Sequence, residues 1–281
     1  ERRSDAGKSI ERNAERLLII MSADTKTLRN RIKSVDSTLH LTKAMGLVAS
    51  SKIRKANEAM FKSRAYLKSL NDIIDILTAA PECRKSPFMR SEGERTRLIV
   101  IAGDRGLAGG YNANVFRTVK ELAAEEVIPI GKRACERFGK ETVSSEYFTS
   151  ADSYALAKQL CADFAEEKFD RLAIVSTKYI SMMAQEAFVR QVLPLSQNKE
   201  KKSVSVVFEP DEVTVLNAAV VEYTAGVIAA SVRESFASEV SARRMAMDNA
   251  GRNAGQMIDD LRLQYNRARQ SAITQEITEI V

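Results

Sequence analysis

The sequence predicts an α/β protein with long helices, in which the N- and C-terminal segments form a two-helix coiled coil around an inserted α/β domain. Three observations predict this fold. Both terminal segments carry apolar or small residues at heptad spacing, short β-branched runs occupy the middle, and helical patterns alternate with those runs. With 281 residues, 44% of them hydrophobic, the chain is long enough to bury a substantial core.

The N-terminal helix is predicted within residues 22–80, and residues 1–21 form an extension to which no role is assigned. Its apolar or small residues recur at alternating steps of four and three: Leu28, Ile32, Val35, Leu39, Thr42, Gly46, Ala49, Ile53, Ala56, Met60, Leu67, Leu70, Ile74 and Leu77. At 1.5 Å per residue such a helix is about 75 Å long. A helix of that length needs a partner along its side.

The C-terminal segment, residues 208–281, supplies that partner on the same repeat. Its seam contains Val240, Met247, Gly251, Ala254, Ile258, Leu261, Tyr265, Ala268 and Ala272. Small residues on both segments predict close approach of the two helices, but the long connection leaves their orientation open. The last residues add Ile273, Ile277 and Ile280 at helical spacing, which predicts an apolar helix end that is frayed or docked inside something larger.

Residues 95–195 predict a small Rossmann-like parallel α/β domain. Its expected strands are "RLIVIAG" at 97–103, "VIPIG" at 127–131 and "RLAIVST" at 171–177, with helices expected at 112–126 and 154–167. Polar, turn-rich segments at 81–94 and 196–203 mark its edges.

The second long helix is expected to reopen shortly after residue 208. Pro210 suits a first helical position, and Asp211 and Glu212 suit the first turn that follows it.

Composition argues against several classes of site. Three distant cysteines (Cys83, Cys135, Cys161) and one histidine (His40) do not have the spacing of a zinc site or disulfide framework, so no metal or cofactor is expected. No Ser/His/Asp set or carboxylate pair stands out as catalytic. No apolar run approaches the roughly 18 residues that a membrane span needs, so a soluble or peripheral protein is expected.

Two other functions remain open from the residues alone. The turn "GDRGLAGGYNANV" at 103–115 follows a strand and precedes a helix, as phosphate-binding turns do, although its spacing fits no standard motif; the alternatives are a structural turn or a stand-alone phosphate-binding enzyme. The net charge of +6 and the basic first helix suit an acidic protein surface or a nucleic-acid adaptor. The basic residues are Lys26, Arg29, Arg31, Lys33, Lys43, Lys52, Arg54, Lys55, Lys62, Arg64 and Lys68.

Three stretches together resemble one family, the gamma subunit of the rotary ATP synthase. They are "IKSVDSTLHLTKAMGLVASSKIRKA", "GDRGLAGGYNANV" and the long C-terminal stretch from "ASEVSARRMAM" to "ITEIV". The resemblance covers about residues 22–281. It implies an antiparallel coiled coil that turns as a rotor shaft inside a ring of alpha and beta subunits, one copy per complex, and that performs no catalysis, binds no cofactor and binds no nucleic acid.

The resemblance also implies partners and contact residues. The α/β domain would meet the epsilon subunit, or its mitochondrial equivalent, and the membrane ring of c subunits. Met45 in "TKAM", Arg243 in "SARRMAM", and Arg269, Gln270 and Thr274 in "ARQSAIT" resemble residues linked to coupling and contact with beta. The expected location is the cytoplasmic face of a bacterial plasma membrane, with the mitochondrial matrix face as the alternative.

Overall fold

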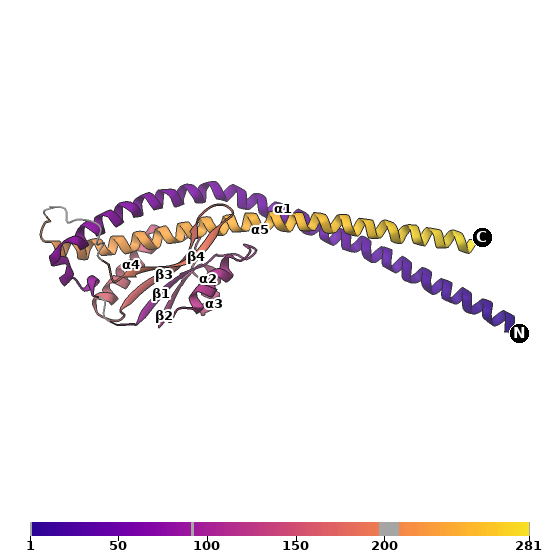
Figure 1. Ribbon diagram of the computed structural model, residues 1–281, viewed down its shortest axis with the longest axis horizontal. Helices are drawn as coiled ribbons and strands as arrows, with labels where there is room; N and C mark the ends of the chain where they lie inside the picture. The colour runs from indigo at the N-terminus through magenta and orange to yellow at the C-terminus, as the bar shows by residue number, and fades with distance from the viewer. Residues whose placement is uncertain (1, 91–92, 197–207, 281) are drawn as a thin grey trace. The chain divides into compact units, whose positions relative to one another are not determined.

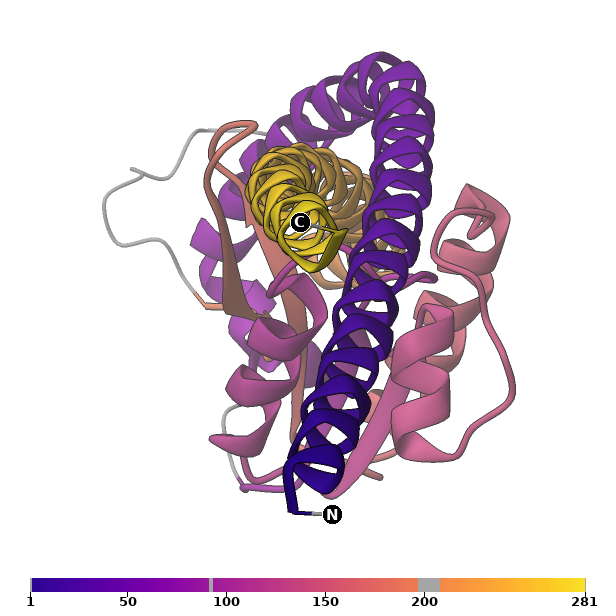
Figure 2. The same cartoon turned by 90° about the vertical axis from the view of Figure 1, so that its right-hand side faces the viewer.

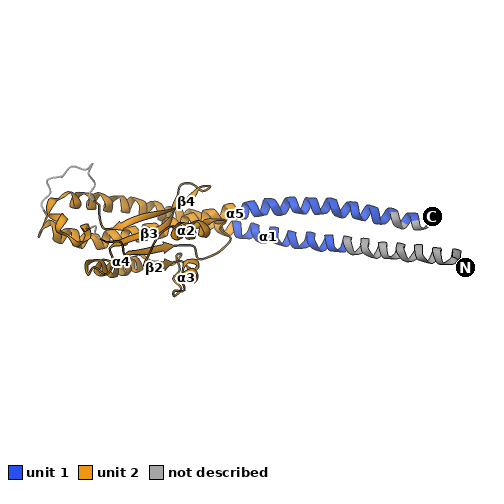
Figure 3. Cartoon of the chain, turned by 60° about the horizontal axis from the view of Figure 1, so that its bottom comes forward, with its two compact units in different colours: residues 1–46, 247–281 blue, residues 47–246 orange. Residues whose placement is uncertain are grey.

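The computed structural model of the chain describes residues 2–90, 93–196 and 208–280, with side chains from residue 25 to 274 outside the gaps and at 277 and 278 (Figure 1). The chain forms two compact units: residues 1–46 with 247–281, called here the coil unit, and residues 47–246, called the sheet unit (Figure 3). Each long helix contributes to both units. The division into 1–21, 22–80, 95–195 and 208–281 stays a prediction.

The two long helices are α1 (Arg2–Ala79) and α5 (Glu212–Ile280). Every predicted seam residue on both is buried or half-buried, as a heptad stripe facing a partner requires. In the coil unit the two helices run side by side (Figure 3), and a Cβ on Gly251 would stand 3.7 Å from Thr42 Oγ1. The predicted close approach at small residues is confirmed.

The two helices are antiparallel. In the sheet unit the guanidinium of Arg233 donates to Ser63 Oγ, and Arg244 farther along α5 donates to Ser50, earlier on α1. In the coil unit, α1 leads toward residue 46 at the end where the α5 segment begins at 247 (Figure 3). The orientation that the family resemblance implied is thus confirmed.

The sheet has four strands in the order β2-β1-β3-β4. Strands β1 (Thr96–Ile101), β2 (Glu126–Ile130) and β3 (Arg171–Tyr179) are parallel and correspond to the three predicted strands. Strand β4 (Gln185–Leu193) is antiparallel to β3 and was not predicted. Four of its nine residues are polar and most are at least partly exposed, as expected for an edge strand, so it lacks the buried apolar run that marks the others.

Alternate residues of β1 face two different cores. Ile99 and Ile101 pack with α4 (Ser150–Ala165) and with the apolar side of α5, including Leu216. Leu98 and Val100 pack with α2 (Tyr111–Lys120) and α3 (Lys132–Phe138). Figure 2 shows α4 and α2 on the two sides of the sheet, and Figure 1 shows α5 lying along the sheet unit between α1 and the strands. Burial of both faces explains the continuous apolar runs of the central strands.

The predicted elements of this part of the chain needed correction at several places. The helix expected at 154–167 is α4, which spans Ser150–Ala165. The helix expected at 112–126 ends at Lys120, because the segment after it supplies β2. Helix α3 was not predicted, since seven residues are too few to show a helical period. The expected edge at 81–94 holds two short 3-10 helices, Pro81–Lys85 and Pro87–Met89, and the edge at 196–203 lies almost wholly outside the described residues.

The start of α5 also differs from the expectation. Pro210 and Asp211 precede the helix, and the Asp211 carboxylate accepts hydrogen bonds from the backbone N–H groups of Val213 and Thr214. Asp211 is therefore the N-cap of α5 and does not lie in its first turn.

Helix α5 contains a stretch that is long and apolar enough, by length and composition, to cross a membrane. Central helices of globular domains meet the same criterion. In α5, Leu216, Val220, Val227 and Ile228 are fully buried in the core of the sheet unit. Packing against the sheet accounts for the apolar character of the helix.

Candidate functional site

The predicted contact residues near the C-terminus lie together on α5 in the coil unit. Arg269, Gln270 and Thr274 are all exposed, and Gln270 and Thr274 are four residues apart, which places them on one face of the helix. The apolar side chains of Ile273 and Ile277 beside them are 46% and 58% exposed. This part of α5 presents a mixed polar and apolar surface of the kind that binds another protein.

Met45 lies in the same unit but far from that surface. It is half-buried on α1, three residues from Thr42, which faces Gly251 on α5. Gln270 is nineteen residues beyond Gly251, so roughly 28 Å of helix separates the two positions. The structure therefore places Met45 and the group at Arg269 at two separate levels of the coil.

Most of the basic residues that the structure describes on α1 are exposed, and two of them are half-buried in ion pairs within the chain. Lys26, Arg29, Arg31, Lys33 and Lys43 of the coil unit are exposed. In the sheet unit, Lys52 pairs with Glu146, and Arg64 donates to Glu234 at 2.7 Å. The exposed positive charge of α1 described in the coil unit is thus well suited to an acidic protein surface.

Arg243 has a different environment from the other predicted contact residues. It lies in the sheet unit, where its side chain is 11% exposed. Its guanidinium bonds the Glu239 carboxylate at 2.5 Å and donates to the carbonyl oxygens of Arg105 and Gly106 at 3.2 Å. The structure thus directs Arg243 toward the glycine-rich turn of its own chain.

Glu239 is the buried partner that sequence reasoning missed. Its side chain is 3% exposed and lies under the turn, where a Cβ on Gly103 would come within 2.6 Å of its Cδ. Burial raises the pKa of Glu239, while the charge and hydrogen bond of Arg243 act to lower it. The spacing of four residues on one helix was the available signal for this pair.

The glycine-rich turn is organised by Asp104. The Asp104 carboxylate accepts hydrogen bonds from the backbone N–H groups of Lys132, Ser145 and Glu146 and from the Ser144 hydroxyl. Burial by itself would raise the pKa of Asp104, but these hydrogen bonds outweigh it and lower the pKa. The first backbone N–H of α3, that of Lys132, therefore donates to an acidic side chain of the protein itself. That side chain lies in the turn for which the sequence left phosphate binding open.

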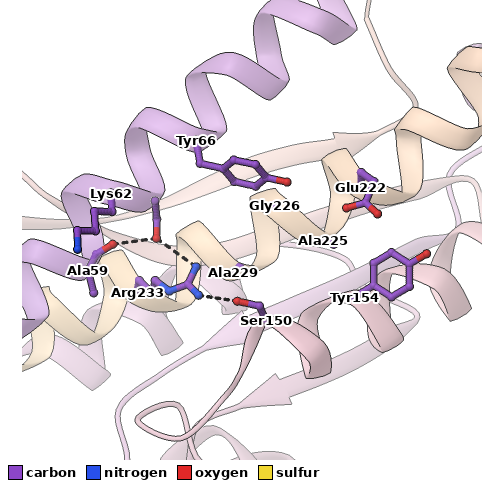
Figure 4. A pocket seen from close by; sticks show the side chains of 11 residues that line it. Ala59, Lys62, Tyr66, Ser150, Tyr154, Glu222, Ala225, Gly226, Ala229 and Arg233 are labelled. Atoms are coloured by element: carbon purple, nitrogen blue, oxygen red, sulfur yellow. Dashed lines mark hydrogen bonds between the residues drawn. The ribbon is translucent and has the colours of Figure 1, made fainter.

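A groove of about 460 Å³ lies among α1, α4 and α5 in the sheet unit (Figure 4). Small residues of α1 and α5, among them Ala59, Ala225 and Gly226, line it, together with Tyr66 and Tyr154. In Figure 4, Arg233 reaches across to Ser150 of α4 and to Ser63 of α1. The hydrogen bonds of Arg233 join the three helices across the groove, which therefore has the character of a packing surface.

No group of three or more His, Cys, Asp or Glu side chains is arranged to bind a metal ion among the residues that the structure describes. The three cysteines are free and buried.

Comparison with known proteins gives a consistent result. A family model described as ATP synthase matches residues 24–281. The ATP synthase gamma chain of Ruminococcus albus is 38% identical over 277 residues, covering 92% of this chain and 96% of that protein. The ATP synthase gamma chain of Moorella thermoacetica is 35% identical over 274 residues, covering 92% and 97%.

Two solved structures share the fold. The rotor of the Euglena gracilis mitochondrial ATP synthase superposes with a TM-score of 0.61 at 16% identity, covering 90% of this chain and 99% of that chain. The central stalk and c ring structure of the Tetrahymena thermophila mitochondrial ATP synthase superposes with a TM-score of 0.57 at 19% identity. The match covers 75% of this chain and 99% of that chain.

Proposed function

Because the chain belongs to the ATP synthase gamma chain family, we propose that it turns as the central shaft of the complex and couples ion flow to ATP synthesis or hydrolysis. It is a non-catalytic central-stalk subunit. The ring of alpha and beta subunits around the shaft performs the chemistry, and one copy of this chain serves each ring. Residues 22–80 and 208–281 form the shaft elements in this scheme, and 95–195 forms the domain at its foot.

The coil unit is the observation that supports this proposal most directly. Its helices bury only a narrow stripe of small and apolar residues against each other, and the remaining surface of α5 near its end is exposed and partly apolar. A pair of long helices with so little shared core is stabilised mainly by what surrounds it. A sleeve of subunits around the coil would supply that packing.

We assign contact with beta to Met45, Arg269, Gln270 and Thr274, and a coupling role to Arg243. The exposed basic residues of α1 in the coil unit would meet acidic loops of beta. Attraction between such surfaces differs from one rotor angle to the next, so it can favour particular angles without covalent chemistry in the shaft.

The sheet unit would bind the epsilon subunit, or its mitochondrial equivalent, and the c ring. As a gamma chain the protein belongs to the membrane-associated F1 portion of ATP synthase. We further propose that it lies on the cytoplasmic face of a bacterial plasma membrane, as its bacterial relatives suggest.

Reconstitution tests this function. The purified chain is mixed with matching alpha and beta subunits, and ATP hydrolysis is measured across a size-exclusion profile. We expect one copy of the chain to elute with six larger subunits and activity to follow that peak. Elution of the chain by itself, with activity unchanged by its addition, would contradict the proposal.

A further inference from the structure

One face of α5 in the sheet unit is bonded to the α/β domain by a row of buried polar contacts, called here the α5 seam. Its members are Glu234, Ser235, Ser238, Glu239 and Arg243. They lie at 234–235, 238–239 and 243, so at 3.6 residues per turn they cover roughly half of the circumference of α5 over about 13 Å. Helices that pack on sheets usually do so through apolar side chains, which makes a polar row unusual.

The first half of the seam binds strand β3. The Glu234 carboxylate accepts from Tyr179 N–H at 3.0 Å and from Arg64 of α1 at 2.7 Å. Ser235 Oγ accepts from Thr177 N–H at 3.1 Å, and the Ser238 hydroxyl donates to the Thr177 carbonyl oxygen at 3.4 Å. Glu234 therefore joins both long helices to the sheet.

The second half binds the glycine-rich turn and α2. The Ser235 carbonyl oxygen accepts from the Tyr111 hydroxyl at 3.0 Å, and Arg243 holds the carbonyl oxygens of Arg105 and Gly106 while pairing with Glu239. The Glu239–Arg243 pair fits under the turn only because residue 103 is a glycine. A Cβ at that position would collide with the Glu239 carboxylate.

Polar contacts constrain the helix in a way that apolar contacts do not. Hydrophobic burial is non-directional, so an apolar interface tolerates sliding and rotation of a helix about its own axis. Hydrogen bonds weaken steeply when their angle changes, and separating a buried ion pair leaves a costly unpaired charge. The α5 seam therefore fixes the rotation of α5 relative to the sheet.

We propose that the α5 seam, and above all the Glu239–Arg243 pair held under the glycine-rich turn, is the torsional lock through which torque passes between the α/β domain and α5. This inference rests on the proposed rotor function. In this torsional lock, Arg243 is a positioning residue that acts through Gly106 and Glu239. Its part in coupling needs no contact with beta.

The test is the torsional stiffness of the assembled rotor. A bead is attached to a Met183→Cys variant, because Met183 is 77% exposed on the loop between β3 and β4 and the three native cysteines are buried. The alpha/beta ring is fixed to a surface, and the thermal variance of the bead angle is recorded while the enzyme waits for ATP. The variance is inversely proportional to stiffness.

We expect Glu239→Gln and Arg243→Gln each to raise the angular variance roughly two-fold, because each removes one charged partner of the Glu239–Arg243 pair. ATP hydrolysis without load should remain close to that of the parent protein, whereas ATP-driven ion pumping against a gradient should fall. Arg243→Lys keeps the charge but not the forked donor geometry, so it should give an intermediate variance.

Matched controls come from an exposed ion pair in the same unit. Arg90 and Glu167 are 59% and 69% exposed and bond each other at 2.6 Å. Arg90→Gln and Glu167→Gln remove the same chemistry from the surface and should leave the variance unchanged. If the charged seam variants do not assemble, the Ser235→Ala, Ser238→Ala double variant removes two α5–β3 hydrogen bonds without exposing a charge and should also raise the variance.

The outcomes separate the two proposals. If the parent chain carries the bead around but the seam variants keep the parent variance and pump normally, the torsional lock is wrong and the rotor function stands. If the parent chain does not turn in the ring, the rotor function itself fails.

Discussion

At the scale of single residues, two positions beside the glycine-rich turn show how side-chain identity follows from geometry. Gly131 has φ +101°, and a Cβ there would stand 2.0 Å from the carbonyl oxygen of Ala102. Asp104 ties the turn to three backbone amides. The sequence marked the turn as glycine-rich, but the carboxylate at its centre could not be assigned, because its partners are up to 42 residues away.

Gly131→Ala tests the steric requirement. The substitution places a methyl group against backbone that cannot move aside, at a φ that L residues rarely adopt, so we expect a loss of about 3 kcal/mol or more in unfolding free energy. Gly139→Ala is the control, because Gly139 also has positive φ (+63°) but meets nothing within 4 Å. It should cost only about 1 kcal/mol. Urea denaturation of both variants decides, and equal losses would refute the steric explanation.

Asp104→Asn tests the role of the carboxylate. The folded-state pKa of Asp104 is lowered, so its charged form contributes stability above the unfolded pKa, and this contribution is lost as pH falls through the folded pKa. We expect the variant to be about 1–3 kcal/mol less stable than the parent at neutral pH. The difference should begin to shrink below about pH 4, where the carboxylate of the unfolded parent becomes protonated, and should be lost only below the lowered pKa of the folded state. A difference that is constant from pH 7 to pH 3 would show that charge is not the cause.

At the scale of elements, the heptad seams and the central strands were predictable because they are periodic and long. The heptad repeat from Leu28 to Leu77 identifies α1, and the continuous apolar runs identify β1, β2 and β3. Strand β4 carries a weak signal, because its polar and apolar residues form neither a strict alternation nor one continuous apolar run. The α5 seam was equally hidden, because serines, glutamates and an arginine on a helix ordinarily indicate a solvent-facing side.

Glycines on the long helices allow a test of close packing. At Gly226 a Cβ would come within 2.3 Å of Leu70 Cδ1, whereas at Gly255 it would meet nothing within 4 Å. Gly255→Ala should therefore stabilise the chain by roughly 0.5–1 kcal/mol through higher helix propensity. Gly226→Ala should lose that gain, because Leu70 must shift out of the helix contact. Thermal unfolding of the two variants measures the contrast, and equal stabilisation by both would rule out close packing at Gly226.

At the scale of the whole molecule, the contact residues are meaningful only in an assembly. Arg269, Gln270 and Thr274 are exposed in the chain, and the structure by itself gives them no partner role. Their assignment came from a family resemblance in the sequence. Spacing and composition could not supply it, because the surface that they bind belongs to other chains.

Arg269→Ala and Gln270→Ala test that assignment. We expect each to lower coupled ATP synthesis several-fold, since truncating an energetically important contact in a protein interface costs more than about 1 kcal/mol. Folding of the purified chain should be unchanged, because both side chains are exposed. Arg262→Ala is the matched control on the same helix. The Arg262 side chain is 65% exposed, and its Nη1 lies 3.9 Å from Asp259 Oδ1, which is a long distance for an ion pair. Normal synthesis and assembly in both test variants would remove these residues from the contact with beta.

Direct observation of rotation tests whether the chain turns inside its ring. A bead on the Met183→Cys variant is followed in single assembled complexes supplied with ATP. We expect stepwise rotation in one direction that stops when ATP is withdrawn. A bead that only fluctuates about a fixed angle, in complexes that still hydrolyse ATP, would contradict it.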